Sequence, residues 1–410
     1  MKKLFSLTLC LLTLTAFPQT STTQYKTDFD YFWKTINDNY AYFDKKKIDW
    51  SSLRPIYQVQ IDTVTSRNSF VHILEKAMNE LYDHHCSLNT NTPISSRLVP
   101  TSTDIWASYK DNRAMIDEVR KGMGAEKVGI KAGMEVVAIN DVKVAEAILP
   151  YLAHNSTIEA RNYALRLALA GNHISKRKIT LRTETGLKDF FPDKDGMLLE
   201  HIEYPAMVQS STFNDIGYIK VNNFLYDNEL IPKFDSVLNA SLQKRALIID
   251  LRETASGGNT SVARAILGRF IAKEHFYQKH ELYAEEKETG IKRSWVEIVS
   301  PRGITYSGQV VILANHWTGS ISEGITIAFD GMKRATIIGT ELARLNGAVE
   351  SFKMPNAKIG FNISTERLYH INGTPRELYK PTITVAMSNQ SPEEDLILKT
   401  AINFLKQKSK

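Results

Sequence analysis

The second half of the chain alternates short, continuously apolar segments with amphipathic ones, and no other feature constrains the fold more. The apolar segments are ALIIDLR (246–252), QVVILAN (309–315) and ATIIG (335–339). Such runs are typical of strands that are buried on both faces of a parallel sheet. The segments with helical spacing are 230–242, 257–271 and 320–331. Because strands and helices alternate, we expect an α/β layer fold for residues 200–410.

Residues 20–96 predict a small helical domain. The apolar positions recur at steps of three and four and are Phe29, Trp33, Ile36, Tyr40 and Phe43 in one series and Phe70, Ile73, Leu74, Ala77 and Leu81 in another. This spacing places each series on one face of an amphipathic helix. Thr27 has a side chain suited to an N-cap, so we expect the first helix to begin there.

Residues 97–190 predict a β-rich domain. Asn140 and Asp141 suit a tight hairpin that follows a strand, and the segment KRKITLRTET (176–185) has the composition of a closing strand. A helix is expected from Val144 to about Leu152.

The N-terminus predicts a secretory signal. Lys2 and Lys3 precede an apolar stretch from Leu4 to Phe17, which is shorter than the roughly 20 residues that span a bilayer. We expect residues 1–19 to be removed and the protein to be exported, to the periplasm or the extracellular space. No later segment is apolar enough to predict a membrane span in the mature form.

Charge and cysteine content exclude several classes of protein. The formal net charge is +6, and loss of Lys2 and Lys3 with the signal leaves +4, a mild excess that predicts no nucleic-acid partner. The chain contains two cysteines, and Cys10 lies in the signal. The mature chain therefore keeps Cys86 alone and can form neither an internal disulfide nor a cysteine-rich zinc cluster.

The segment ELYDHHCSLNT (80–90) contains the four letters of the membrane palmitoyl-acyltransferase signature, Asp83-His84-His85-Cys86. Those enzymes need several transmembrane helices and a cysteine-rich zinc domain, and neither is present. Two other interpretations are a pair of zinc ligands and a catalytic base. The local residues do not decide between them.

A second candidate site is the segment ILANHWTGSISEGITIAFDG (312–331), where a buried strand leads to a helix that begins at Ser320. The N–H groups of a first helical turn lack partners within the helix and lie at the positive end of its dipole, so they can hold an oxyanion. Alternatively, Ser320 is only an N-cap, and Glu323 completes a capping box. Gly257 and Gly258 also precede a helix, where they suit either a close ligand approach or an ordinary turn.

Five segments, in this order, resemble motifs of the C-terminal processing peptidase and tricorn-type family of serine peptidases. They are LYDHHCSL (81–88), GIKAGMEVVAINDVKV (129–144), ALIIDLRETASGGN (246–259), TGSISE (318–323) and NGTPRELYKPTITV (372–385). The second is similar to part of a PDZ domain. The resemblance implies a PDZ-like domain over residues 97–190 and an α/β catalytic core of the crotonase/Clp-protease-like type over residues 200–410.

The resemblance also implies roles for individual residues. Ser320 would be the nucleophile, with the N–H of Ile321 as one oxyanion donor and that of Gly257 or Gly258 as the other. One branch of the family activates its serine with a lysine about two dozen residues downstream. Residues 339–345 contain no lysine, and arginine stays protonated and cannot act as a base.

The tricorn-like branch takes a histidine from the first segment and a glutamate from the last, which are His85 and Glu377 here. His85 would act as general base, and Glu377 would orient it or polarise the site. A zinc site of His84, His85 and Glu377 is an alternative, although its ligands lack the usual spacing. A nucleophilic Cys86 is disfavoured because neighbouring side chains of an extended segment diverge.

Two segments depart from the family pattern. The loop that contains residues 253–256 is about one residue longer than usual, and residues 379–382 lack the usual glycine.

The sequence therefore predicts an exported serine-type peptidase that acts on peptides or on the C-terminal regions of polypeptides through an acyl-enzyme. No metal or organic cofactor is implied. The alternative is a non-catalytic protein of the same fold that binds a peptide or another ligand. The sequence does not indicate the oligomeric state.

Overall fold

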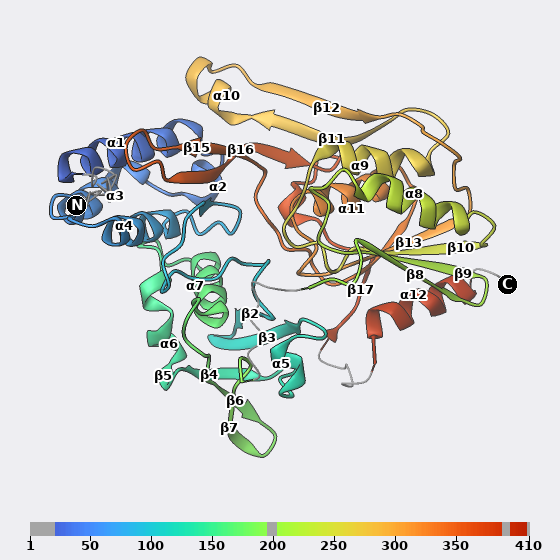
Figure 1. The fold of residues 1–410 in the computed structure, drawn as a ribbon, viewed down its shortest axis with the longest axis horizontal. Helices are drawn as coiled ribbons and strands as arrows, with labels where there is room; N and C mark the ends of the chain where they lie inside the picture. Colours follow the sequence, from blue (N-terminus) through green and yellow to red (C-terminus); the bar gives the residue numbers. More distant parts are fainter. Residues whose placement is uncertain (1–20, 195–202, 388–393, 408–410) are drawn as a thin grey trace, which may run out of the picture.

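The computed structural model describes residues 21–194, 203–387 and 394–407 (Figure 1). An α/β core lies at the right of Figure 1, a group of helices lies at the left, and a small β domain lies below them. Across these three ranges, no helix is both long enough and apolar enough to span a bilayer. The predicted signal, residues 1–19, falls outside the described residues.

The core contains a six-stranded sheet in the order β17-β14-β13-β10-β9-β8. Its strands are β8 (Val208–Phe213), β9 (Ile216–Val221), β10 (Ala246–Asp250), β13 (Gln309–Ala314), β14 (Thr336–Gly339) and β17 (Ile383–Thr384). All neighbouring strands are parallel except β8 and β9. The predicted multi-domain α/β organisation is confirmed.

Both faces of this sheet are covered, which explains the uninterrupted apolar runs. Leu247 and Ile249 pack on one face, in the core that also includes residues of α8 (Leu230–Ala240), α9 (Thr260–Leu267) and α11 (Ile321–Gly331). Ala246 and Ile248 point to the other face, against α12 (Leu396–Gln407). Figure 1 shows the first three helices above the sheet and α12 below it. Because successive side chains of a strand point to opposite faces, every position of β10 is buried.

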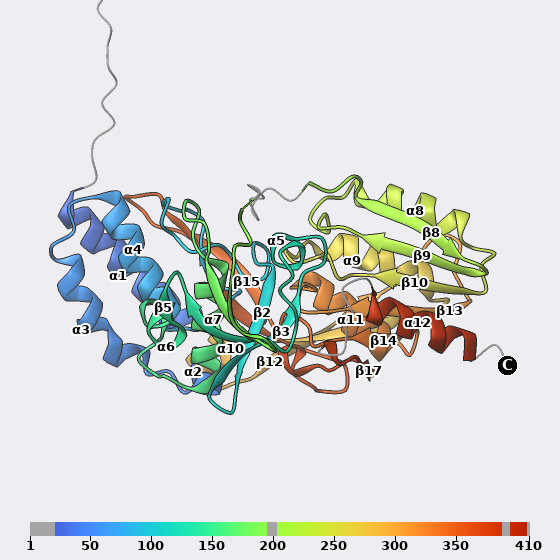
Figure 2. The same cartoon turned by 90° about the horizontal axis from the view of Figure 1, so that it is seen from below.

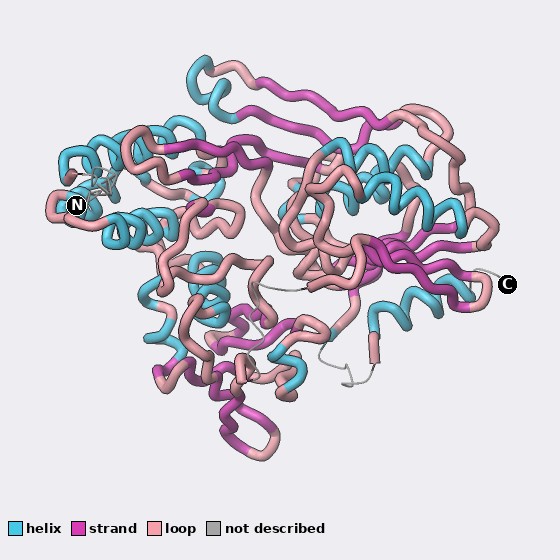
Figure 3. Tube along the Cα trace, in the orientation of Figure 1, coloured by secondary structure: helices cyan, strands magenta, loops and turns pink. Residues whose placement is uncertain are grey.

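A second sheet of five strands connects the core to the helices, as the magenta strands across the top of Figure 3 show. Its members are β1 (Ser87–Leu88), β11 (His275–Leu282), β12 (Arg293–Val299), β15 (Ala348–Lys353) and β16 (Gly360–Tyr369). Helix α10 (Tyr283–Thr289) joins β11 to β12. No pattern in the sequence predicted this sheet. It matters for the site because β1 directly follows the two histidines.

The N-terminal helices are α1 (Thr22–Asn39), α2 (Phe43–Lys46), α3 (Trp50–Ile61) and α4 (Arg67–Asn79). The N-cap of α1 is Ser21, whose hydroxyl accepts from the N–H of Gln24. The prediction of Thr27 as N-cap is wrong, since its hydroxyl donates to the Thr23 carbonyl inside the helix. The helices do not close their core alone, because it includes residues of β16 such as Phe361, whose ring lies 5.0 Å from that of Phe32.

The small β domain is a six-stranded sheet in the order β2-β3-β4-β6-β7, with β5 beside β4. Its strands are β2 (Ile105–Lys110), β3 (Arg113–Val119), β4 (Glu135–Ile139), β5 (Val142–Lys143), β6 (Ile179–Thr183) and β7 (Gly186–Phe190). Its helices are α5 (Gly124–Lys127), α6 (Val144–Ala147), the 3-10 turn η1 (Leu149–Tyr151) and α7 (Ile158–Ala170). Helix α7 was not expected from the sequence. Figure 2 shows this domain between the N-terminal helices and the core.

Candidate active site

Ser320 lies in the turn between β13 and α11, directly before the first residue of the helix. Its backbone has φ 54° and ψ −116°, a conformation that non-glycine residues rarely adopt. An ordinary N-cap residue is extended. Strain of this kind costs on the order of 1–3 kcal/mol and gathers at functional sites. Capping alone therefore does not explain the conformation of Ser320.

His85 faces Ser320 although 235 residues separate them, with its Nε2 atom 3.0 Å from the Ser320 Oγ. The other ring nitrogen, Nδ1, lies 2.7 Å from the carbonyl oxygen of Asn346. Because a carbonyl oxygen can only accept, Nδ1 carries the hydrogen, and Nε2 of the neutral ring presents its lone pair to the serine hydroxyl.

The backbone around His85 is fixed by a buried carboxylate. One oxygen of Asp83 accepts from the His85 N–H at 2.9 Å. The other accepts from the hydroxyls of Tyr40, at 3.1 Å, and Ser364, at 3.0 Å. Since Ser364 belongs to β16, the five-stranded sheet and the N-terminal helices together hold the histidine in place.

Burial determines the charge of His85. Burial, together with the nearby positive charge of Arg376, lowers the pKa of His85 to about 4. The contact with the Asn346 carbonyl and the charge of Asp83 oppose that decrease. The ring is therefore neutral at pH 7 and able to accept a proton.

Gly257 is the glycine that approaches Ser320. A Cβ atom at position 257 would lie 2.7 Å from the Ser320 Cβ and 2.9 Å from its Oγ, and Gly257 has φ +78°. The same added atom would lie 3.9 Å from the backbone nitrogen of Ile321. The backbone of Gly257 and the start of α11 therefore lie on either side of the Ser320 side chain.

Gly258 has a different environment. A Cβ atom there would lie 2.2 Å from the carbonyl oxygen of Leu225. This glycine allows two backbone segments to pass each other. Of the two glycines named from the sequence, Gly257 is the one whose added Cβ would lie against the Ser320 side chain.

Glu377 lies in the 3-10 turn η3 (Arg376–Leu378). Burial raises the pKa of its carboxyl group, and Oε2 has no hydrogen-bond partner among the described residues. None of the described hydrogen bonds joins Glu377 to His85. The ring nitrogen that Glu377 was expected to orient faces the Asn346 carbonyl instead.

Glu323 has more contacts at the site than the sequence suggested. It is fully buried, and its Oε2 accepts from the N–H of Ser320 at 2.9 Å and from that of Leu345 at 3.3 Å. Its Oε1 accepts from the N–H of Arg344 at 3.0 Å. The sequence placed Glu323 only as the partner of an N-cap. The links to residues 344 and 345 had no sequence signal, since they depend on a loop that returns from β14.

The remaining candidates from the sequence lie elsewhere or have other partners. His84 stacks on Tyr163 with ring centroids 4.4 Å apart, and burial lowers its pKa well below the usual range. Burial raises the pKa of the Cys86 thiol.

In the part of the chain that the structure describes, no group of three or more His, Cys, Asp or Glu side chains could hold a metal ion. His84, His85 and Glu377 therefore do not form the zinc site considered as an alternative.

Arg344 occupies the region where the other branch of the family has its lysine. Its Nε donates to the carbonyl oxygen of Glu377 at 2.9 Å, and its Nη1 lies 3.5 Å from Glu341. The side chain is thus engaged away from Ser320.

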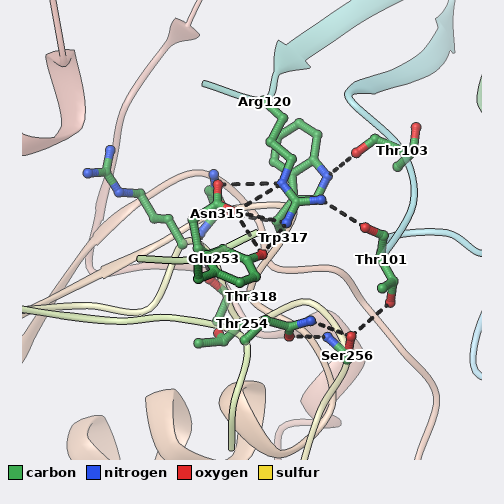
Figure 4. A network of polar contacts seen from close by, with 12 residues as sticks. Thr101, Thr103, Arg120, Glu253, Thr254, Ser256, Asn315, Trp317 and Thr318 are labelled. Atoms are coloured by element: carbon green, nitrogen blue, oxygen red, sulfur yellow. Dashed lines mark hydrogen bonds and ion pairs between the residues drawn. The ribbon is translucent and has the colours of Figure 1, made fainter. Parts of the chain in front are cut away.

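The loop before Ser320 and the loop that contains Gly257 are tied to the small β domain. Figure 4 shows the contacts of Trp317, Arg120 and Glu253 that make this connection. The indole N–H of Trp317 donates to the Thr103 carbonyl at 2.8 Å. Arg120, the residue after β3, donates to Glu253 at 2.8 and 3.1 Å and to the Thr101 carbonyl at 2.8 Å. The longer loop around residue 253 is therefore held by the neighbouring domain.

A carboxylate of the small β domain also contacts the loop that leads to Ser320. Glu118 accepts from the Asn315 side chain at 3.0 Å and from the Thr340 hydroxyl at 2.7 Å, and it lies 2.6 Å from the His316 Nδ1. All three partners belong to the core. The small domain thus fixes the loop before the nucleophile as well as the loop that contains Gly257.

Comparison with known proteins shows what this chain is similar to. The model of peptidase family S41 matches residues 215–385, and the model of the tricorn protease C1 domain matches residues 21–79. Among solved structures, mature CPAF complexed with lactacystin has a TM-score of 0.62 at 15% identity, over 94% of this chain and 97% of that chain. The photosystem II D1 C-terminal processing protease has a TM-score of 0.59 at 13% identity, over 92% and 96%.

The two family matches together cover more than half of the chain, and they include the segments that carry Ser320, Gly257 and Glu377. His85 falls between the two matched regions. Residues 215–385 thus match peptidase family S41, and the expected resemblance to serine peptidases of C-terminal processing and tricorn type is confirmed.

Proposed function

We propose that this protein is an exported serine-type peptidase that cleaves peptides or the C-terminal regions of polypeptides. Ser320 is the nucleophile and His85 is the general base. The observation that carries the proposal is the 3.0 Å contact between Ser320 Oγ and His85 Nε2, in a ring whose other nitrogen faces a backbone carbonyl.

The first half of the reaction forms the acyl-enzyme. Oγ attacks the scissile carbonyl carbon while Nε2 takes the hydroxyl proton, and the electron pair of the C=O bond moves to oxygen. The N–H groups of Ile321 and Gly257 are the donors for this oxyanion. When the C–N bond breaks, the leaving amine takes the proton from Nε2 of His85 and departs.

The second half restores the enzyme. A water molecule donates one proton to Nε2 of His85 as its oxygen attacks the acyl carbon. The oxyanion forms again beside the same N–H groups and collapses by breaking the bond to Oγ. Ser320 regains its proton from His85, and a carboxylic acid leaves.

Neutral His85 supports this cycle, since burial and Arg376 lower its pKa to about 4. The Asn346 carbonyl supports the same step, because it stabilises the N–H at Nδ1 and thereby leaves Nε2 free to accept. In this proposal Asn346 performs the orienting role. Glu377 places a buried carboxyl group near Arg376 and Asp83. It does not contact the base directly in this proposal.

Fluorophosphonate labelling tests the proposal without a known substrate. The chain from residue 20 onwards is expected to be labelled at Ser320, as peptide mass mapping would show, and Ser320→Ala should not be labelled. His85→Gln should label at least a hundredfold more slowly, since a general base contributes about 10²–10⁴-fold. The matched control is His275→Gln, whose histidine lies at the start of β11 and should not affect the rate.

Two other results of the labelling experiment would contradict the proposal. Labelling that persists in Ser320→Ala would remove the nucleophile assignment. A folded wild-type protein that resists labelling would favour the alternative, a non-catalytic protein that binds a peptide or another ligand.

Export has a separate test. The complete chain would be expressed in a bacterial host, and the N-terminus of the protein recovered outside the cytoplasm would be sequenced. A new N-terminus near residue 20 would support the signal, whereas a cytoplasmic protein that still begins at Met1 would contradict it.

A further inference from the structure

The carboxylate of Glu323 joins two chain segments that are distant in sequence. It accepts from the N–H of Ser320 on the nucleophile turn, and from the N–H groups of Arg344 and Leu345 on the loop after β14. The three distances are 2.9, 3.0 and 3.3 Å. Glu323 has no exposed surface, so these contacts are made in the protein interior, where hydrogen bonds to a charged group are strong.

The second of these segments, residues 344–347, is the one that orients His85. Asn346 directly follows the two residues bound by Glu323, and its carbonyl oxygen lies 2.7 Å from the His85 Nδ1. Arg376 holds the same segment from the other side, with Nη2 donating to the carbonyls of Leu345 at 3.1 Å and Gly347 at 2.7 Å.

The segment needs such support because its backbone is strained. Arg344 has φ 58° and Gly347 has φ 49°, and only glycine adopts this region at little cost. A Cβ atom at position 347 would lie 1.7 Å from the Glu366 carbonyl oxygen. The loop is therefore packed tightly and bent sharply where it presents the Asn346 carbonyl.

The contacts close a ring from Ser320 through Glu323, the 344–346 segment and His85 back to the Ser320 hydroxyl. We propose that Glu323 is a positioning residue that holds the nucleophile turn and the segment that orients His85 at a fixed position relative to each other. The contact between Ser320 Oγ and His85 Nε2 then depends on the Glu323 carboxylate. The inference rests on the proposed function, since it concerns the alignment of the same serine and histidine.

The charge state of Glu323 offers a readout that a purely structural role would not give. Burial raises its pKa to about 7, although Arg376 and the three N–H groups oppose that rise. A protonated carboxyl group places a hydrogen towards N–H donors and loses at least one contact. The charged or titratable groups that face this region are Arg376, at 3.8 Å, and His85 across Ser320, whose pKa is about 4.

The experiment measures the rate of fluorophosphonate labelling of the chain from residue 20 onwards between pH 4 and pH 9. For the wild type, we expect the rate to fall as the pH decreases through about 7. For Glu323→Gln, we expect a rate at pH 8 that is about 10- to 100-fold lower, the loss that follows removal of a charge-assisted hydrogen bond. That rate should stay level down to about pH 5, because the titrating group is gone.

A second variant keeps the test decisive if Glu323→Gln does not fold. Glu323→Asp retains a titrating carboxylate on a side chain that is one methylene shorter, so it should label slowly and keep the decrease near pH 7. The matched control is Glu281→Gln, which alters a buried carboxylate on β11 that is bound by Lys279 and Tyr369. It should leave both the rate and its pH dependence unchanged.

Two results would overturn the inference. One is a wild-type profile that falls only near pH 4, and the other is a Glu323→Gln profile that still falls near pH 7. Failure of the proposed function looks different, because the wild type would then not be labelled at any pH.

Discussion

Arg120 and Glu253 form a buried ion pair between the small β domain and the loop that contains Gly257. The guanidinium Nη2 lies 2.8 Å and Nε 3.1 Å from the same carboxylate oxygen. The Arg120 side chain is 1% exposed and that of Glu253 is 11% exposed. A residue of the small β domain therefore fixes a loop of the core, and the position of that loop depends on both units being folded.

The Arg120–Glu253 pair is expected to contribute to stability as a unit. Removal of one partner leaves an unpaired buried charge and costs about 3–5 kcal/mol, whereas replacement of both by apolar side chains is often nearly neutral. We expect Arg120→Met and Glu253→Met each to lower the urea midpoint of unfolding, and the double variant to regain much of that loss. An additive double variant would show that the two charges do not depend on each other.

Gly257 should tolerate no side chain. In Gly257→Ala the new methyl group would collide with Ser320, since its Cβ would lie 2.7 Å from the Ser320 Cβ. We expect labelling by a fluorophosphonate to fall by about 10²–10³-fold, because the collision displaces the N–H of residue 257 and loss of one oxyanion donor has an effect of this size. Gly122→Ala is the matched control, because Gly122 has the same φ of +78° but open space around its added Cβ. Equal losses in the two variants would attribute the effect to backbone strain alone.

The α/β core was predictable because its strands are buried on both faces. At β10 every position is buried, so the sequence reads as one apolar run. The five-stranded sheet was not predictable, since β12 is an edge strand with mostly exposed residues. Its exposed apolar residues include Trp295 and Ile298, which blurs the alternation that would mark a half-buried strand. Helix α7 was missed because alanines make up much of its buried face.

The approach of His85 to Ser320 was expected only through the resemblance to a family. Nothing in the spacing of two residues 235 positions apart indicates a 3.0 Å contact. The carbonyl of Asn346 could not be foreseen at all, because any residue type supplies a backbone carbonyl. For the same reason, sequence patterns favour side-chain partners such as Glu377 over main-chain ones.

Cys86 should be inert in the folded protein. Burial raises the pKa of its thiol, and its Sγ lies 3.5 Å from an Asp83 oxygen. A thiol reacts as the thiolate, so we expect no alkylation by iodoacetamide at pH 8 and complete alkylation in denaturant. The chain from residue 20 onwards contains no other cysteine, which makes mass spectrometry of the intact protein sufficient. Rapid alkylation of the native form, with loss of activity, would revive a role for this thiol at the site.

Asp83 should determine how good a base His85 is. Its negative charge raises the pKa of His85 against the effect of burial, and its Oδ1 fixes the His85 backbone. Asp83→Asn keeps an oxygen for that N–H but removes the charge, so the pKa of His85 should fall further and the base should weaken. We expect labelling to slow by up to about tenfold, since one pKa unit corresponds to about 1.4 kcal/mol.

The control for Asp83→Asn is Asp28→Asn, which changes another fully buried carboxylate that holds the backbone of residues 356 and 357. Both variants lose a buried charge and should be destabilised. Only Asp83→Asn should also reduce the labelling rate of the protein that remains folded, because only Asp83 acts on the imidazole. Labelling at the wild-type rate in folded Asp83→Asn would show that the Asn346 carbonyl alone suffices to maintain the base.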